Sequence, residues 1–315
     1  MIVVTGGAGF IGSNVVATLN RRGRDDILLV EDFADGRKCA NLADCVIADF
    51  LDWRQCLARL EAGGELPGTI ERVIHLGACS DTTEWNGQLV MESNFRFSRA
   101  LFEYATARRI PFVYASSAAV YGSGQTFAET PANERPLNMY GYSKLVFDQF
   151  VRTRLPTLAS TVVGLRYFNV YGPREQHKGR MASVAWHFQR QLVDTGRVRL
   201  FGASHGCAAG EQRRDFVHVD DVVDVTLHCA ELDAGLSGIY NCGTGQAETF
   251  NQVARSVIAA CGHGDIEYID FPADLLHAYQ AYTEADLTAL RSTGYTTRFR
   301  DVARGVGEYV SWLAS

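Results

Sequence analysis

A tyrosine and a lysine lie four residues apart in the stretch Tyr140-Gly-Tyr-Ser-Lys144. On a helix this spacing places both side chains on one face. A phenol with a pKa of about 10 is a poor base at neutral pH, but a nearby ammonium group favours its phenolate form. Tyr140 can then take the proton of an alcohol while hydride leaves the same carbon. Because any amphipathic helix can carry such a pair, the pair alone is a weak signal.

Two serines strengthen this hypothesis. Ser116 and Ser117 directly follow an apolar run that is typical of a buried strand, and either hydroxyl can hold the oxygen of a substrate alcohol. Tyr142 is the alternative base, but the residue four positions after it is Val146. We therefore predict a hydride-transfer site in which Tyr140 is the base.

A glycine-rich segment, Gly6-Gly-Ala-Gly-Phe-Ile-Gly12, follows the apolar run Met1–Thr5 and opens a helical stretch. Glycines allow a tight turn and close approach of the backbone to a pyrophosphate, and the start of the helix supplies N–H groups. Three glycines can also form an ordinary turn. An acidic residue, Glu31, lies 19 residues after Gly12, which is the spacing of a dinucleotide-binding unit.

The choice between NAD and NADP is open in this sequence. Glu31 and Asp32 can accept hydrogen bonds from a ribose diol, as in NAD binding. Arg37 and Lys38 follow closely and can neutralise the 2′-phosphate of NADP. The alternative is that both cations are solvated loop residues.

The elements that position these residues are read from hydrophobic runs separated by helical patterns, notably Asn94–Arg108 and Ser143–Arg154. Continuous apolar strands alternating with helices indicate a parallel sheet covered on both faces. We predict an α/β fold with a Rossmann-type doubly wound sheet. Its first six strands are expected at Met1–Thr5, Ile27–Val30, Val46–Ala48, Arg72–Leu76, Phe112–Ala115 and Thr161–Leu165.

The pattern loosens after about residue 170. Segment 171–180 is polar and turn-rich, and segment 202–214 is a Gly/Ala-rich loop. A helix from Asp220 to about Leu232 and a strand at Gly238–Asn241 are expected to return to the sheet. We predict a dinucleotide-binding domain over 1–168, with a return segment at 217–241, and a smaller α/β substrate lobe over 169–216 and 242–315.

Composition limits the function further. The chain has 315 residues and a net charge of −6, with 47% hydrophobic and 21% charged residues. These values fit a soluble globular protein and exclude disordered and collagen-like classes. The acidic balance argues against a nucleic-acid partner. No apolar run approaches the roughly 18 residues of a membrane span, and no signal peptide is visible. The eight cysteines lack zinc or redox spacing, so we expect free thiols in a cytoplasmic protein.

Four stretches resemble the extended short-chain dehydrogenase/reductase superfamily: Thr5–Gly12, Ser-Ser-Ala-Ala-Val-Tyr-Gly at 116–122, the Tyr140/Lys144 pair and Arg214–Val219. More closely, the chain is similar to nucleotide-sugar 6-epimerases of that superfamily that act on ADP-heptose. The more specific stretches are 77–85, 166–174, 177–179 and 181–187. The resemblance covers essentially the whole chain.

This resemblance implies epimerisation of ADP-D-glycero-D-manno-heptose to ADP-L-glycero-D-manno-heptose, for precursors of the lipopolysaccharide inner core. One tightly bound NADP per subunit takes hydride from C6″ while Tyr140 takes the hydroxyl proton. The resulting ketone lies outside the sugar ring, so rotation about C5″–C6″ presents its other face for hydride return. The rotated oxygen needs a second proton donor, and the resemblance suggests Lys178. The alternative is that Lys178 is a solvated loop lysine.

The residues after the hydroxyl separate two reaction types. In related sugar dehydratases the catalytic hydroxyl residue lies four positions before the tyrosine of Val-Tyr-Gly. Asp-Glu directly follows that hydroxyl residue. Counting back from Tyr121, that hydroxyl is Ser117, and Ala118-Ala119 follow it. A dehydratase is therefore disfavoured. The same count favours Ser117 over Ser116 for the substrate oxygen, without separating them firmly.

The resemblance also implies binding residues. The expected catalytic set is Tyr140, Lys178, Lys144, Ser116 and Ser117. Cofactor contacts are expected from Gly6, Gly9, Phe10, Ile11, Gly12, Glu31, Asp32, Lys38, His75, Leu76, Gly77, Ala78, Cys79, Asn94, Lys144, Val170 and Lys178. Substrate contacts are expected from Asn169, Arg180, His187, Phe201, Gly202, Ala203, Ser204, Arg214 and Tyr279. Arg214 is the expected diphosphate partner, with Arg213 as its competitor. No metal is expected.

The chain departs from the family pattern at two places. The stretch His205–Glu211 is longer than expected, and Trp53 stands where the family often has a cation near the cofactor. The NADP preference therefore depends mainly on Lys38. NAD is the alternative cofactor. The alternative functions are another nucleotide-sugar epimerase or reductase, or a non-catalytic dinucleotide sensor. The intact Tyr140, Lys144 and Ser117 set argues against a sensor. The resemblance further implies a homo-oligomer, with pentamers among the family's assemblies.

Overall fold

A computed structural model describes residues 1–272 and 279–315. The described residues form two compact units. Unit 1 comprises Met1–Val120, Pro136–Arg166 and Val223–Tyr240, and unit 2 comprises Tyr121–Arg135, Tyr167–Val222 and Asn241–Ser315. Residues 121–135, 167–168, 217–222 and 241, which are expected in the first domain, belong to unit 2.

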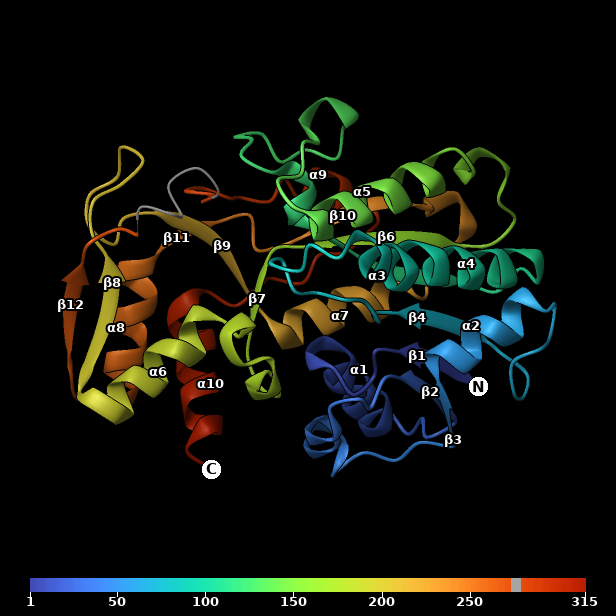
Figure 1. Cartoon of the computed structure of the whole chain (residues 1–315), viewed down its shortest axis with the longest axis horizontal. Coiled ribbons are helices and arrows are strands. Elements are labelled where there is room, and N and C mark those ends of the chain that lie inside the picture. The colour runs from blue at the N-terminus through green and yellow to red at the C-terminus, as the bar shows by residue number, and fades with distance from the viewer. Residues whose placement is uncertain (273–278) are drawn as a thin grey trace. The chain divides into compact units, whose positions relative to one another are not determined.

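Unit 1 is built on a seven-stranded sheet in the order β10-β6-β5-β4-β1-β2-β3 (Figure 1). The strand β1 pairs in parallel with β2 and β4, and its four residues are all buried. Strands buried on both faces are typical of doubly wound sheets. The predicted fold class is confirmed. The strands are β1 (Ile2–Thr5), β2 (Ile27–Glu31), β3 (Asp49–Asp52), β4 (Arg72–His75), β5 (Phe112–Ser117), β6 (Val162–Tyr167) and β10 (Gly238–Cys242).

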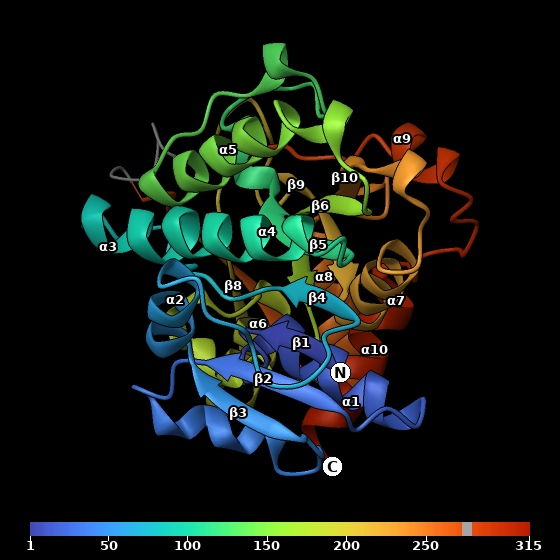
Figure 2. The same cartoon turned by 90° about the vertical axis from the view of Figure 1, so that its right-hand side faces the viewer.

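Helices cover both faces of this sheet. On one face α2 (Trp53–Glu61), α4 (Phe97–Ala107) and α5 (Met139–Arg152) pack together, and α3 (Gly87–Met91) lies beside α5. On the other face lie α1 (Phe10–Arg21) and the Val223–Cys229 part of α7 (Val219–Cys229) (Figure 2). The core under α2, α4 and α5 is rich in aromatic side chains, including Phe102, Phe112, Tyr114 and Phe147.

Some predicted boundaries are wrong. The helix α7, expected to end at about Leu232, ends at Cys229. The third strand is not at Val46–Ala48, where Val46 is 58% exposed, but at Asp49–Asp52. β3 is the edge strand of the sheet and pairs only with β2. Its polar residues therefore face solvent, and no apolar run marks this strand in the sequence. The helix expected at Ser143 begins at Met139, because the Asn138 side chain accepts a hydrogen bond from the Gly141 N–H and caps it.

Unit 2 combines small sheets with three packed helices. Its three-stranded sheet has the order β11-β9-β7, and β8 pairs in parallel with β12. The helices α6, α8 and α10 enclose a separate apolar core that includes Phe188, Phe216 and Tyr309. The elements are β7 (Asn169–Tyr171), α6 (Val184–Thr195), β8 (Arg197–Phe201), β9 (Arg213–His218), β11 (Ala247–Thr249), α8 (Phe250–Cys261), β12 (Asp265–Ile269), α9 (Thr288–Ser292) and α10 (Val302–Leu313).

Within the described ranges, no helix combines the length and the apolar character that crossing a membrane requires.

Candidate active site

The glycine-rich loop between β1 and α1 is built for close backbone approach. Gly6 has a φ of +66°, and a Cβ there would lie 2.6 Å from the Cα of Gly77, so a side chain is excluded. The Thr5 hydroxyl accepts a hydrogen bond from the Gly77 N–H at 3.0 Å and holds the ends of β1 and β4 together. The helix α1 begins at Phe10 with no acidic residue in its first turn. These features fit the pyrophosphate of a dinucleotide.

Glu31, at the end of β2, is tied to this loop. Its buried carboxylate accepts hydrogen bonds from the Ala8 N–H at 2.9 Å and the Asp32 N–H at 2.7 Å. The Lys38 ammonium lies 3.3 Å from the same carboxylate and donates to the Asp32 carbonyl at 3.0 Å. The Asn41 side chain donates to the Ala8 carbonyl at 3.0 Å. This network places a cation beside the acidic pair.

A second cation accompanies Asp32. The indole of Trp53 donates to the Asp32 carboxylate at 3.3 Å, and the Arg54 guanidinium lies 3.2 Å from the same oxygen. Arg54 also stacks on the Trp53 ring, 4.5 Å from its centroid. Trp53 stands where a cation is expected, and the neighbouring Arg54 supplies one that the family pattern does not reveal. By contrast, Arg37 is paired with Asp35 through two 2.8 Å contacts.

Buried polar side chains support the segment that follows β4. His75 is buried, and its ring nitrogens lie 2.6 Å from the Thr5 hydroxyl and 2.7 Å from the Ser98 hydroxyl. Burial lowers the pKa of His75 to about 3, so the ring is neutral and structural. Asn94 binds both backbone groups of Cys79, at 2.7 and 2.9 Å.

Asn94 lies in a π-helical turn, Glu92–Arg96, directly before α4. Its amide also donates to the Ser143 hydroxyl on α5 at 3.0 Å. The π turn thus connects the expected cofactor segment 76–79 with the helix that carries Tyr140 and Lys144. Such turns are rare and often occur at functional sites.

Tyr140 and Lys144 lie on α5 as predicted. Burial raises the pKa of Tyr140, and the Ser117 hydroxyl beside the phenol lowers it. The Lys144 ammonium lies 6.0 Å from the Tyr140 ring centroid and donates to the Ala115 carbonyl at 2.8 Å. Burial lowers the pKa of Lys144 to about 8, against the opposing effect of Asp148. The three side chains thus meet at the carboxyl end of β5.

Ser116 and Ser117 have different surroundings. Ser116 is buried, and its hydroxyl donates to the Asp148 carboxylate at 2.9 Å. Asp148 also binds the Tyr114 hydroxyl at 2.9 Å and the buried Arg166 guanidinium at 2.8 and 3.0 Å. Ser117 is only partly buried and faces Tyr140. Of the two hydroxyls, only that of Ser117 lies beside the phenol.

Lys178 lies in unit 2, in the 3-10 segment Gln176–Met181 between β7 and α6. Burial lowers the pKa of Lys178, and the charge of Glu175 opposes this shift. Arg180, two residues on, is exposed. The His187 Nε2, on α6, lies 3.3 Å from the Arg180 carbonyl oxygen. Three of the predicted site residues thus lie in neighbouring turns of unit 2: Lys178, Arg180 and His187.

Arg214 is a buried cation on β9. Its guanidinium lies 5.0 Å from the centroid of the Tyr279 ring and donates to the Arg213 carbonyl at 3.2 Å. Burial lowers the pKa of Arg214 to about 10. Within the described part of the chain it has no carboxylate partner. Arg213 is exposed instead, so Arg214 is the better candidate for binding an anion.

The Gly/Ala-rich stretch forms a short hairpin. Ser204 and Cys207 exchange two backbone hydrogen bonds of 2.8 and 3.1 Å, and the residues between them, His205 and Gly206, both have positive φ. This is the backbone of a tight two-residue turn. The His205 ring packs on Tyr279, with centroids 5.6 Å apart.

Other predicted substrate residues surround this hairpin. The Gln212 side chain holds the Gly202 carbonyl at 3.1 Å and the Ser204 hydroxyl at 2.8 Å. Phe201 and Phe271 complete an aromatic cluster with Tyr279, with centroids 5.1 to 6.4 Å apart. Asn169, on β7, is exposed and accepts from the Thr283 hydroxyl at 3.4 Å.

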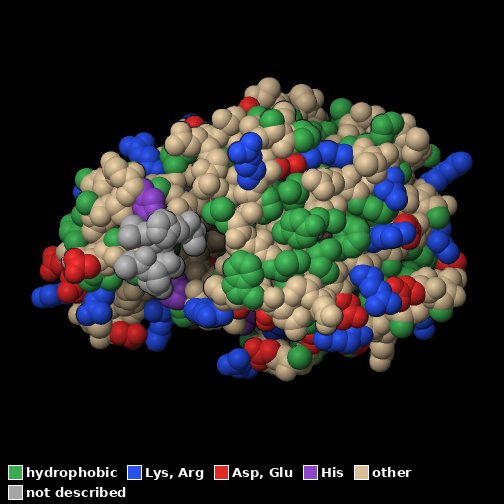
Figure 3. Space-filling view, turned by 45° about the horizontal axis from the view of Figure 1, so that its top comes forward, with side chains coloured by type: hydrophobic (Ala, Val, Ile, Leu, Met, Phe, Trp, Pro, Cys, Tyr) green, Lys and Arg blue, Asp and Glu red, His purple; other side chains and the backbone are tan. Residues whose placement is uncertain are grey.

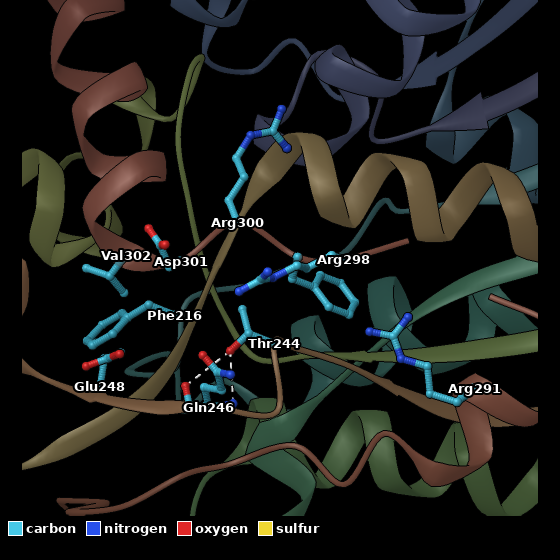
Figure 4. A pocket seen from close by; sticks show the side chains of 10 residues that line it. Phe216, Thr244, Gln246, Glu248, Arg291, Arg298, Arg300, Asp301 and Val302 are labelled. Carbon is cyan, nitrogen blue, oxygen red and sulfur yellow. Dashed lines mark hydrogen bonds between the residues drawn. The ribbon is translucent and has the colours of Figure 1, made fainter. Parts of the chain in front are cut away.

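A polar cavity of about 140 Å³ in unit 2 contains none of the predicted site residues. Its arginines are largely engaged: Arg300 binds Asp221 and Glu308, and Arg291 binds backbone carbonyls. Figure 4 shows Arg300 extending away from Thr244 and Gln246, which are hydrogen-bonded to each other. The lining residues are Phe216, Thr244, Gln246, Glu248, Arg291, Arg298, Phe299, Arg300, Asp301 and Val302. Across residues 1–272 and 279–315, no cluster of potential metal ligands is present.

Comparison with known proteins identifies the family. Residues 2–243 match the NAD dependent epimerase/dehydratase family. The chain belongs to this family.

One relative is the ADP-L-glycero-D-manno-heptose-6-epimerase of Alkalilimnicola ehrlichii, which is 58% identical over 314 residues and covers 100% of this chain and 98% of the relative. The crystal structure of the Helicobacter pylori enzyme of the same name has a TM-score of 0.86 at 30% identity, covering 100% and 96% of the two chains. The Thermus thermophilus UDP-glucose 4-epimerase, in complex with NAD, has a TM-score of 0.78 at 27% identity, covering 100% and 99%. The sequence-based resemblance is confirmed, and the chain is an epimerase of the isomerase class.

Proposed function

We propose that this epimerase interconverts the two C6″ epimers of ADP-glycero-D-manno-heptose, with NADP as its tightly bound cofactor, in the synthesis of lipopolysaccharide inner-core precursors. The observation that carries the proposal is the Tyr140 phenol next to the Ser117 hydroxyl, with the Lys144 ammonium 6.0 Å from the Tyr140 ring centroid, on the sheet edge that also carries the dinucleotide loop. The 58% identity to a full-length relative of that name supports the substrate.

When bound, NADP would supply the acceptor for the hydride of C6″ and the hydride that returns to the opposite face. Tyr140 takes the proton of the C6″ hydroxyl, because its phenol is the group next to Ser117. Ser117 donates a hydrogen bond to the same substrate oxygen and so orients it. The Lys144 ammonium stabilises negative charge on the phenol and is held in place by the Ala115 carbonyl.

A second proton-transfer residue is needed after the C5″–C6″ bond has rotated, because the ketone oxygen then points elsewhere. Lys178 suits this role, since burial lowers the pKa of its amine towards the working pH. Arg214 offers a guanidinium to the diphosphate, and Tyr279 and the neighbouring rings offer an aromatic surface to the base.

The test is to incubate the purified protein with one epimer of ADP-glycero-D-manno-heptose and no added cofactor. We expect the other epimer to accumulate to a constant ratio from either starting material, which proton NMR of the C6″ position measures. Interconversion of UDP-glucose and UDP-galactose instead would assign the chain to 4-epimerisation and contradict the proposal.

Replacing the two serines in turn should separate their roles. Ser117→Ala removes the donor to the substrate oxygen, and we expect kcat to fall by about 10- to 100-fold. Ser116→Ala removes one donor from buried Asp148, and we expect the free energy of unfolding to fall by about 1 kcal/mol with kcat within about threefold of wild type. Steady-state kinetics and thermal unfolding of both variants measure this. A larger kcat loss in Ser116→Ala would reverse the assignment.

The cofactor preference should depend on Lys38. Its ammonium is placed beside the acidic pair, where the 2′-phosphate of NADP would bind, so Lys38→Ala should weaken NADP relative to NAD by about tenfold. Arg37→Ala is the matched control, because Arg37 is paired with Asp35. Fluorescence titration of the apoprotein with each dinucleotide gives the ratio. An equal loss of affinity for NADP and for NAD would show that Lys38 does not select NADP.

Assembly and location remain predictions. Unit 1 exposes several large hydrophobic side chains, including Trp85 (71%), Tyr142 (50%) and Leu137 (44%), and Figure 3 shows hydrophobic side chains gathered on the face in view. Apolar surface of this kind supports self-association. We propose a homo-oligomer, with a pentamer as one form, in the cytoplasm.

A further inference from the structure

The segment between β7 and α6 is closed by one buried carboxylate. Glu175 has no exposed surface. Its side chain accepts hydrogen bonds from the Gly172 N–H at 3.3 Å, the Ser183 N–H at 2.6 Å and the Ser183 hydroxyl at 2.6 Å. These donors lie at the two ends of the segment, so the carboxylate joins residues that are eleven positions apart. Lys178 lies between them.

The same glutamate also holds the backbone next to Lys178. Its carbonyl accepts the Lys178 N–H at 2.9 Å. The residues around Lys178 have unusual backbone angles: Arg174 has a φ of +72°, and Gly179 has φ +53° and ψ −121°. Such conformations cost free energy and persist only where the surroundings impose them. The bonds to Glu175 provide such a constraint at both ends of the segment.

The Glu175 carboxylate is also linked to the start of α6. The Ser183 hydroxyl donates to Glu175 and also accepts from the Trp186 N–H at 3.3 Å, which caps the helix. The Gly172 N–H, the Ser183 N–H and the Ser183 hydroxyl all donate to Glu175, and a side chain with two acceptor oxygens satisfies all three. A glutamine would turn an NH2 group towards at least one of these donors. Burial raises the pKa of Glu175, and its hydrogen bonds to Ser183 and Gly172 and the charge of Lys178 oppose this shift.

We propose that Glu175 is a positioning residue for the reaction: its carboxylate closes the 172–183 segment and thereby holds Lys178 where it transfers its proton. This inference rests on the proposed function of Lys178. Glu175 contacts neither substrate nor cofactor in this role and acts only through Lys178.

The test compares Glu175→Gln with Lys178→Met and with the double variant. We expect Glu175→Gln to lower kcat by about 10- to 100-fold, with KM within about threefold and the bound dinucleotide content unchanged. In the Lys178→Met background, Glu175→Gln should change the residual rate by less than about twofold, because the residue through which it acts is gone. If Glu175→Gln lowered kcat by the same factor in the wild-type and the Lys178→Met backgrounds, the proposal would be overturned. A kcat within threefold of wild type for Glu175→Gln alone would overturn it as well.

A matched control and a second readout make the result independent of the substrate. Asp221→Asn removes another buried carboxylate of unit 2, one that binds Arg300 and not the 172–183 segment. Amide hydrogen exchange over 172–183 should accelerate at least tenfold in Glu175→Gln and stay at the wild-type rate in Asp221→Asn. Unchanged exchange in Glu175→Gln contradicts the closure.

If Glu175→Gln fails to fold, Ser183→Ala, which removes a single donor, replaces it in the same measurements. If wild type does not interconvert the epimers while exchange over 172–183 responds as expected, the proposed function fails and the closure stands.

Discussion

Tyr140→Phe should lower kcat for epimer interconversion by about 1,000-fold. The variant keeps the ring and its packing but loses the phenol oxygen that lies next to Ser117. Without the phenol, no group next to Ser117 can take the hydroxyl proton as hydride leaves. Binding should be nearly unaffected, so that the dinucleotide content stays at the wild-type value and KM changes little.

Tyr142→Phe is the matched control for this prediction. Tyr142 lies two residues away on the same helix, but it is 50% exposed and lies off the face that carries Lys144. Its kcat should stay within about twofold of wild type. Proton NMR of the two epimers gives the rates, and mass spectrometry gives the dinucleotide content. A Tyr140→Phe enzyme that retained a tenth of wild-type activity would exclude the phenol as the base.

Lys178→Met should lower kcat by about 100-fold or more, with NADP still bound. The amine is the only group proposed to exchange a proton with the oxygen in its second position. Among its 30 basic residues, the chain has three lysines, Lys38, Lys144 and Lys178, and 27 arginines. Since arginine does not lose its proton in proteins, lysine is the one of these two basic side chains that can release a proton.

Lys178→Arg distinguishes proton transfer from simple charge. If Lys178 transfers a proton, arginine at this position should be nearly as inactive as methionine. If the residue only attracts a negative group, arginine should restore at least a third of wild-type kcat, and the proposed role would be wrong. Thermal unfolding of both variants checks that unit 2 remains folded.

The parts of the fold that the sequence predicts are those that depend on local patterns. The glycine spacing and the buried strands β1, β2, β4, β5 and β6 follow from hydrophobic runs, which need no knowledge of tertiary contacts. β3 was misplaced because an edge strand is half exposed and lacks an apolar run. The start of α5 was missed because the capping role of Asn138 outweighed a weak helical pattern before Ser143.

The candidate site could be predicted only in part, for a similar reason. Tyr140 and Lys144 follow from spacing on one helix. The different surroundings of Ser116 and Ser117 depend on Asp148, which is 32 residues from Ser116 in sequence. Glu175, Asn94 and Arg54 act through contacts that no local pattern reveals. The roles assigned to the site residues stay predictions until the variants are measured.

The position of β10 at the edge of the seven-stranded sheet has a consequence for synthesis on the ribosome. Six strands are present once Tyr167 has emerged, but the seventh begins only at Gly238. Until then the outer edge of β6, which is fully buried in the finished protein, has no partner strand. An unpaired, hydrophobic edge pairs readily with other chains. We therefore expect chains that end before β10 to associate with other chains more readily than the complete protein.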